Sequence, residues 1–263
     1  MKKADILLCG YGHIGKKLYP DFLKLGYVDI FDPNIESDFS KYSNIKCNNF
    51  DYFKNKHYDI AFICVPTPTV NNKCDTSIVE EMIEKLKFIA QVIVIKSTVP
   101  VGFTQNMITK GYNVIFSPEF SGCTPNVGEH PYVLLGGEKQ YTSKVAELYK
   151  KAYSGNFIIK QNINPSVYEM LKLTANSALA TRVLFYNLIA DACNESGIDY
   201  DDVRECLLLD SRFNPSHTVV YKDQPYYDSH CFNKDVPAFA YQFNNELLKL
   251  VENINTQRKN RSK

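Results

Sequence analysis

Short apolar runs alternate with longer amphipathic stretches over roughly the first 160 residues of the chain. The apolar runs are ADILLC, YVDIF, DIAFICV, VIVI, NVIF and YVLL, and a stretch with helical spacing such as 14–25 follows the first of them. Short strands separated by helices are typical of βαβ units and a parallel sheet. The pattern therefore predicts an α/β fold whose N-terminal domain, residues 1–163, is a doubly wound Rossmann domain.

The pattern changes after Pro165. Residues 166–196 carry apolar positions at helical spacing with no proline or glycine, and Gly197 follows them, which predicts one long helix. A second helix is expected over 201–209, a loop rich in Pro, Tyr and His over about 211–233, and a last helix from Val236 toward the C-terminus. Residues 164–263 are thus expected to form a mainly helical region.

The charges are balanced and carry little information about partners. The chain has 30 Lys and Arg against 29 Asp and Glu, a formal net charge of +1, so no field of one sign favours nucleic acid or an anionic membrane. No apolar run reaches the roughly 18 residues of a membrane span. The basic tail, residues 257–263, is expected to be a solvated, fraying end without a role.

The spacing of the cysteines and histidines argues against a disulfide framework and against a metal site. Eight cysteines are spread over 263 residues and none stands in a CxxC pair, so reduced thiols in a cytoplasmic protein are expected. The five histidines show no ligand spacing, so no metal site is predicted.

A glycine-rich turn predicts the cofactor. Gly10, Gly12 and Gly15 form GxGxxG directly after the first predicted strand and directly before a helix, where the glycines permit a tight turn and close approach of a pyrophosphate. Asp32 closes the next strand, where a carboxylate binds a ribose 2′-OH and repels a 2′-phosphate. NAD rather than NADP is therefore predicted, with Tyr11, His13 and Ile14 completing the loop.

Three proline-containing stretches follow later strands: CVPTP (64–68), KSTVPVG (96–102) and SPEF (117–120). Ligands of doubly wound sheets lie beyond the carboxyl ends of the strands, so these loops are expected to face cofactor and substrate, although each could be an ordinary turn. The residues assigned to the cofactor here are Val65, Pro66, Thr67, Ser97 and Thr98, and Glu119 offers a carboxylate. Lys172 and Asn176 share one face of the long helix. They are either a surface pair or a clamp for developing oxyanion charge.

Taken in order, these motifs resemble the UDP-glucose/GDP-mannose dehydrogenase family. The resemblance rests on GYGHIG, Asp32, CVPTP, KSTVPVG, SPEF, the Glu169-x-x-Lys172-x-x-x-Asn176 spacing, and Cys231-Phe232-x-Lys234-Asp235. It implies an NAD-dependent oxidation of the C6 alcohol of a UDP-sugar to a carboxylate in two hydride transfers, with UDP-glucose to UDP-glucuronate as the leading reaction. Such enzymes are cytosolic, are usually dimeric or larger and serve polysaccharide synthesis. The long helix is expected to form a homodimer.

The resemblance also implies roles for individual residues. Cys231 would hold the substrate as a thiohemiacetal and then a thioester, while Lys172 and Asn176 stabilise the oxyanion. Asp235, Glu119 and Thr98 would serve proton transfer and hydrolysis. Lys234 would lie at the nicotinamide end, and Arg212 would reach the substrate across a dimer interface. The substrate-binding set is Glu119, Lys172, Asn176, Arg212 and Cys231.

The chain departs from the family in three places. Residues 223–230 replace a glycine-rich loop before the cysteine, Ser121–Thr124 replace a Leu-Arg-Glu-Gly stretch, and a second Rossmann-like domain is expected to be missing. Two alternatives therefore stay open. One is an NAD-binding relative with reduced or no acid-forming activity that needs a partner chain or another substrate. The other is a 3-hydroxyacid dehydrogenase, which needs no cysteine.

Overall fold

The computed structural model describes residues 3–39, 44–120, 132–153 and 158–262. The chain divides into two compact units. The first comprises Met1–Pro68 and Asp75–Lys172, and the second comprises Thr69–Cys74 and Leu173–Lys263. The sequence prediction places the domain boundary between residues 163 and 164, and the division between the units lies at Lys172.

An eight-stranded sheet forms the first unit, in the order β10-β9-β8-β7-β4-β1-β2-β3. The strands are β1 (Ala4–Cys9), β2 (Gly26–Phe31), β3 (Lys46–Cys47), β4 (Tyr58–Ile63), β7 (Ala90–Ile95), β8 (Val114–Phe116), β9 (Tyr132–Gly136) and β10 (Ile158–Asn162). All neighbouring strands are parallel except β8 and β9. Because β1 lies between β2 and β4, the chain reverses its winding direction at β1, which confirms the doubly wound α/β prediction. The switch point, where the strand order reverses, therefore lies beyond Cys9 and Ile63, at the carboxyl ends of β1 and β4.

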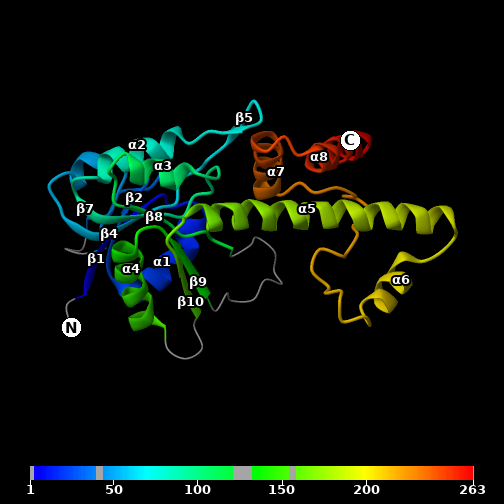
Figure 1. Ribbon diagram of the computed structural model, residues 1–263, viewed down its shortest axis with the longest axis horizontal. Coiled ribbons are helices and arrows are strands. Elements are labelled where there is room, and N and C mark those ends of the chain that lie inside the picture. The colour runs from blue at the N-terminus through cyan, green and yellow to red at the C-terminus, as the bar shows by residue number, and fades with distance from the viewer. Residues whose placement is uncertain (1–2, 40–43, 121–131, 154–157, 263) are drawn as a thin grey trace. The chain divides into compact units, whose positions relative to one another are not determined.

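Helices cover both faces of this sheet (Figure 1). The helices α1 (His13–Leu25) and α4 (Lys139–Ala152) bury residues in one apolar core, while α2 (Ser77–Leu86), α3 (Phe103–Thr109) and the 3-10 helix η1 (Phe50–Phe53) line the other. On α2, Val79, Met82, Ile83 and Leu86 are all buried, the spacing of a helix with one apolar face. Each such side chain contributes roughly 1.5–3 kcal/mol by leaving water.

The second unit is mainly helical. It contains most of α5 (Ser166–Glu195), then α6 (Tyr200–Leu207), α7 (His230–Gln242) and α8 (Glu246–Arg261). Its core consists of Ala180, Leu184, Tyr227, Val236, Ala240, Leu248 and Val251. One long helix over 166–196 was predicted from the sequence, and α5, which ends at Glu195, confirms it.

A short hairpin from the first half of the sequence joins this second unit. It consists of β5 (Thr69–Val70) and β6 (Lys73–Cys74), which are antiparallel and contact α7. The two turn residues, Asn71 and Asn72, have φ values of 50° and 61°. Two central residues with positive φ are typical of a type I′ turn, and asparagine tolerates that conformation.

The helices after residue 229 differ from the sequence prediction. Two helices replace the single one expected from Val236, and the first begins at His230 because the Ser229 hydroxyl accepts a hydrogen bond from the Phe232 N–H at 3.1 Å. The chain breaks at Asn244, whose φ is 50°, and a new N-cap at Asn245 starts α8.

The prediction of a fraying tail was also wrong, because α8 continues to Arg261 and the Arg258 side chain is only 12% exposed. Among the helices that the structure describes, none has both the length and the hydropathy needed to cross a bilayer.

Candidate active site

The glycine-rich turn connects β1 to α1 at the switch point of the sheet. Gly10 has a φ of 98°, and a Cβ there would lie 2.4 Å from the Cys64 carbonyl oxygen, so only glycine fits. Gly12 precedes the first turn of α1, and a Cβ at Gly12 would meet no atom within 4 Å. The backbone is therefore bare and accessible at the start of α1, as a bound pyrophosphate requires.

Asp32 lies directly beside this turn. One carboxylate oxygen accepts a hydrogen bond from the Tyr11 N–H at 2.6 Å, and the other accepts one from the Asn34 N–H at 2.8 Å. The predicted pair of a glycine-rich turn and a strand-end carboxylate is thus adjacent in space. Such an arrangement fits NAD, whose pyrophosphate would lie on the helix N-terminus and whose ribose hydroxyls would reach the carboxylate. His13 and Ile14 open α1 beside that position.

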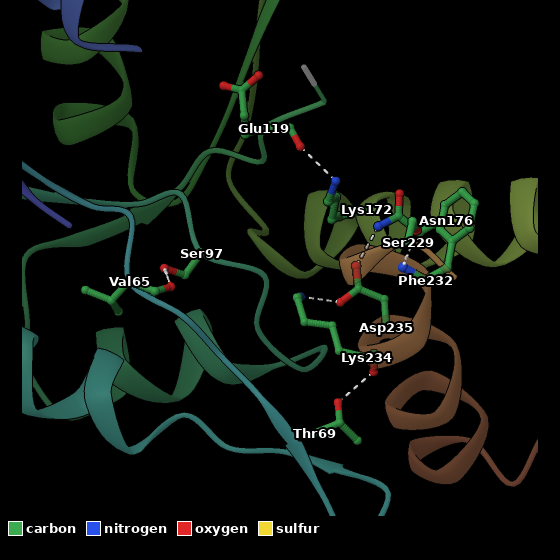
Figure 2. Close-up of polar contacts among 10 residues, drawn as sticks. All are labelled: Val65, Thr69, Ser97, Glu119, Lys172, Asn176, Ser229, Phe232, Lys234 and Asp235. Carbon is green, nitrogen blue, oxygen red and sulfur yellow. Dashed lines mark hydrogen bonds and ion pairs between the residues drawn. The ribbon is translucent and has the colours of Figure 1, made fainter. Parts of the chain in front are cut away.

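The loops after β4 and β7 are joined at the next position along the sheet. The Ser97 hydroxyl donates a hydrogen bond to the Val65 carbonyl at 2.7 Å (Figure 2). Thr67 and Ser97 are buried, Val65 and Thr98 are partly exposed, and Pro66 is exposed. The cofactor residues predicted on these two stretches therefore belong to one packed group of loops beside the switch point.

Two cysteines at these strand ends are poor nucleophiles. Cys9 is the last residue of β1, and Cys64 directly follows β4. Burial raises the pKa of Cys64 to about 12 and the pKa of Cys9 well above its ordinary value. Both thiols thus stay protonated at neutral pH and serve packing rather than chemistry.

Glu119 is held by two lysines through different atoms. Its carboxylate lies 3.4 Å from the ammonium of Lys96, a residue that is 6% exposed and also donates to the Ser117 hydroxyl at 3.3 Å. Its backbone carbonyl accepts a hydrogen bond from Lys172 at 2.8 Å (Figure 2). The Lys172 ammonium also lies 5.0 Å from the centre of the Phe120 ring. The predicted residues Glu119 and Lys172 are thus in direct contact.

Sequence reasoning assigned no role to Lys96. A lysine that ends the buried run VIVI is a signal in itself, because an ammonium at the end of a central strand is expensive to bury without a partner. Its pairing with Glu119 identifies that partner. The residues Ser121–Thr124, which depart from the family pattern, lie outside the described residues.

Glu169 joins the loop after β7 to α5. It is fully buried, and its two carboxylate oxygens accept hydrogen bonds from the Gly102 N–H at 2.6 Å and the Thr104 N–H at 2.8 Å. These N–H groups belong to the first turn of α3 and its cap, which have no partner within the helix. Burial raises the pKa of Glu169, and the hydrogen bonds from Thr104 and Gly102 partly offset that rise. Glu169 appears in the family motif, yet only the structure shows that its carboxylate binds the start of α3.

In the second unit, Cys231 occupies the second position of α7. The side chain is half-buried, and Ser229 caps the helix. The positive end of the helix dipole favours a thiolate in the first turn. Cys231 and Asp235 are four residues apart, so they lie on one face of α7.

Asp235 is the centre of a buried polar cluster. Its carboxylate accepts hydrogen bonds from the Asn176 side-chain amide and from the Lys234 ammonium, both at 2.5 Å (Figure 2). Asp235 is 3% exposed and Asn176 is 7% exposed. The Thr69 hydroxyl on the β5–β6 hairpin donates to the Lys234 carbonyl at 2.7 Å. Predicted residues of α5 and α7 are therefore linked through one carboxylate.

Arg212 stands apart from this cluster. Its side chain is 81% exposed and is paired with the Asp210 carboxylate at 2.5 Å. An arginine in that position is available to a ligand or to a second chain, and its role stays a prediction. Within the described part of the chain, no group of three or more His, Cys, Asp or Glu residues could hold a metal ion.

Comparison with known proteins identifies two domains of one family. Residues 21–153 match the NAD binding domain of the UDP-glucose/GDP-mannose dehydrogenase family, and residues 166–257 match the central domain of the same family. The first match confirms the prediction of an NAD-binding domain.

Individual relatives agree with this assignment. The UDP-glucose 6-dehydrogenase of Rickettsia prowazekii is 32% identical over 221 residues, which are 78% of this chain and 48% of that protein. The chain spans about half the length of the curated relatives it matches. A solved UDP-glucose dehydrogenase from Pyrobaculum islandicum superposes with a TM-score of 0.79 at 21% identity, over 97% of this chain and 68% of that one. A UDP-D-ManNAc dehydrogenase from Pyrococcus horikoshii gives 0.75 at 20% identity, over 96% and 68%. Both structures share the fold.

Proposed function

This chain belongs to the UDP-glucose/GDP-mannose dehydrogenase family, and from that premise we propose that it oxidises the C6 alcohol of UDP-glucose to the carboxylate of UDP-glucuronate. The observation that carries the proposal is the face of α7 on which Cys231 precedes the buried Asp235 by one turn, with Asn176 and Lys234 bonded to that carboxylate. An alcohol that loses two hydrides must be retained at the aldehyde stage, and a cysteine thiolate retains it covalently.

The cofactor NAD would accept one hydride in each of the two oxidations. In the first half of the reaction, Lys172 and Asn176 would bind the C6 oxygen and position a water, and they would stabilise the negative charge on that oxygen as the alcohol proton passes to the water. The Cys231 thiolate then adds to the aldehyde carbon to form a thiohemiacetal, and loss of the second hydride converts this adduct to a thioester on Cys231.

Hydrolysis of the thioester completes the reaction. Glu119 is the residue we assign as general base, because its carboxylate is held beside the ammonium of Lys96 and a carboxylate can accept a proton from water. Thr98 would orient that water. Asp235 would fix the amide of Asn176, to which it is already bonded. It would also take the proton of the Cys231 thiol when the thiolate forms and return it to the sulfur when the sulfur leaves.

We also propose that the chain forms a homodimer through α5, in keeping with the family. On the part of α5 that belongs to the second unit, Phe185 is 54% exposed and Leu188 is 43% exposed. They lie three residues apart and so share one face. A Phe185→Glu change should shift the mass measured by light scattering to that of a monomer. Leu209→Glu, at a position 86% exposed outside α5, should leave the mass unchanged, and a monomeric wild type would refute this arrangement.

The cytoplasm is the compartment we propose for the reaction. The seven cysteines in the described ranges are thiols rather than halves of disulfides, and a reducing compartment keeps a nucleophilic thiol available.

The activity is tested by counting NADH at 340 nm per UDP-glucose consumed by the purified chain. Two NADH per sugar are expected for the wild type. Cys231→Ala should abolish the second NADH and the acid product, whereas Cys206→Ala, at an exposed cysteine on α6, should leave both unchanged. Full two-step stoichiometry in Cys231→Ala would refute the covalent mechanism.

The alternatives are separated by the same assay. Because the chain spans about half the length of its curated relatives, an NAD-binding relative that needs a partner chain is the second candidate. It predicts normal NAD binding with no turnover of any UDP-sugar by the isolated chain. A 3-hydroxyacid dehydrogenase would keep its activity after Cys231 is alkylated, because that reaction uses no thiol.

A further inference from the structure

The segment before Cys231 is irregular in conformation but firmly attached. Between α6 and α7 the chain has no helix or strand over residues 208–229. Residues 223–230, which include Pro225–Tyr227, stand where the family resemblance leads us to expect a glycine-rich loop. Such a loop would normally be mobile. Here two side chains of α8 bond to its backbone.

Asn255 makes the first attachment. Its side-chain oxygen accepts a hydrogen bond from the Tyr227 N–H at 2.9 Å, and its side-chain amide donates to the Tyr227 carbonyl at 3.0 Å. Asn255 is 6% exposed, so water cannot easily replace these bonds. One side chain therefore satisfies both backbone groups of one residue, as a neighbouring β-strand would.

Arg258 makes the second attachment one turn later on α8. Its Nε donates to the Pro225 carbonyl at 2.5 Å, and its two terminal nitrogens donate to the Asp191 carboxylate on α5 at 2.5 and 3.2 Å. A guanidinium suits this position because its donors diverge in a fixed plane and can serve a carbonyl and a carboxylate at once. The loop is thereby tied to α5 as well as to α8.

The attachment is close enough to Cys231 to determine where the thiol lies. Only three residues separate Tyr227 from Cys231, and one of them, Ser229, caps α7. The Tyr227 ring is 5% exposed and meets the Phe232 ring edge to face, with centroids 5.9 Å apart. The backbone of Tyr227 is thus fixed close to the first turn of α7, and its side chain packs against Phe232 in that turn.

We propose that Asn255 and Arg258 are positioning residues for Cys231, which hold the loop over Pro225–Tyr227 so that the first turn of α7 presents the thiol in one orientation. The proposal rests on the proposed function, in which Cys231 is the nucleophile. All the contacts that carry it lie within the second unit. It assigns this chain a side-chain clamp in place of the family's glycine-rich loop.

The test uses the full chain with Asn255→Leu, Asn255→Asp and Arg258→Lys, and with Asn253→Leu as the matched control on an exposed position of the same helix. Leucine keeps the volume of the side chain but removes both hydrogen bonds. Aspartate keeps the acceptor for the Tyr227 N–H and loses the donor. Lysine keeps the charge of Arg258 but cannot bond to Pro225 and Asp191 in the same geometry.

The first measurement is the rate at which iodoacetamide alkylates Cys231 between pH 6 and pH 9, with the site identified by peptide mass spectrometry. The pH profile for Cys231 should move in the Asn255 variants, and the rate at pH 7 should change by at least about threefold, because the thiol no longer keeps its place at the helix N-terminus. Alkylation of Cys206 in the same samples should stay constant, and Asn253→Leu should match the wild type.

The second measurement separates kcat from KM. With UDP-glucose and NAD, kcat should fall at least about tenfold in Asn255→Leu, as expected when a nucleophile is misplaced, while KM for NAD stays within about twofold. If Asn255→Leu does not fold, Asn255→Asp and Arg258→Lys carry the same test.

Unchanged alkylation profiles in all three folded variants would overturn the proposal. This outcome is distinct from failure of the proposed function, because the alkylation rates do not require turnover. Conversely, a wild type without turnover would still support the clamp if the profiles move.

Discussion

Replacing Glu169 by glutamine tests whether one buried carboxylate secures the loop after β7 to α5. The two oxygens of Glu169 accept hydrogen bonds from Gly102 at 2.6 Å and from Thr104 at 2.8 Å, and the residue is fully buried. Glutamine has nearly the same shape but keeps one acceptor. Its NH₂ group must face one of the two backbone N–H groups, which leaves that donor without a partner.

The expected loss of stability follows from the one backbone N–H group that loses its acceptor. A buried donor left without a partner costs about 1–3 kcal/mol, so the free energy of unfolding should fall by about that amount at pH 7. Because burial raises the pKa of Glu169 above its ordinary value of 4.5, the folded state binds this proton more readily than the unfolded state does. The contribution of Glu169 to stability is therefore complete below pH 4.5 and declines as the pH rises through the folded-state pKa. The gap between wild type and variant should widen on acidification.

Urea denaturation followed by far-UV circular dichroism measures the change, with Glu195→Gln as the control. Glu195 is exposed on the same helix, and surface substitutions of this kind stay within about 0.5 kcal/mol. A Glu169→Gln variant as stable as this control at pH 7 would refute the reasoning, because it would mean that the N–H groups of Gly102 and Thr104 find other partners.

Three further predictions concern the cofactor turn, a histidine and the hairpin. Gly12→Ala should fold normally, since a Cβ there meets nothing within 4 Å, but should weaken NAD binding at least about tenfold by titration calorimetry; unchanged affinity would contradict the turn's role. Burial and the nearby Arg182 charge lower the pKa of His217, so the free energy of unfolding should fall as the pH drops below 6.5. In His217→Asn, urea titrations should show a less steep fall over the same pH range. Equal slopes would refute this. Thr69→Val should lower unfolding stability by about 0.5–1.5 kcal/mol through loss of its bond to Lys234, and no change in the urea midpoint would argue against that bond.

The main features of the first unit could be predicted because they depend on local pattern. Short apolar strands, amphipathic helices and a glycine-rich turn are all written within a few neighbouring residues. Asp32 was correctly placed beside the turn because the geometry of a βαβ unit determines where its second strand ends. The helix boundaries after residue 229 were less predictable, because the N-caps Ser229 and Asn245 act through single hydrogen bonds.

The candidate site was predicted as a set of residues, without its internal contacts. Glu119 and Lys172 were both named from the sequence, yet the bond between them runs from an ammonium to a backbone carbonyl. No motif specifies such a partner. Likewise, the family spacing includes Asn176 and Asp235, and only the structure shows that one bonds to the other.

The sequence by itself determined the doubly wound sheet, the cofactor turn and the long helix, because these follow from periodicity and from short motifs. The residues that carry the proposed chemistry were named through the family resemblance, and their roles stay a proposal. Tertiary structure alone decided which distant groups meet. It joined the hairpin at Thr69 to α7, Lys96 to Glu119, and Asn255 to the backbone before Cys231. The physical reason is that a buried polar group must pair with whichever partner the folded chain brings close to it. Because the two partners are far apart in the sequence, no local sequence pattern identifies the pair.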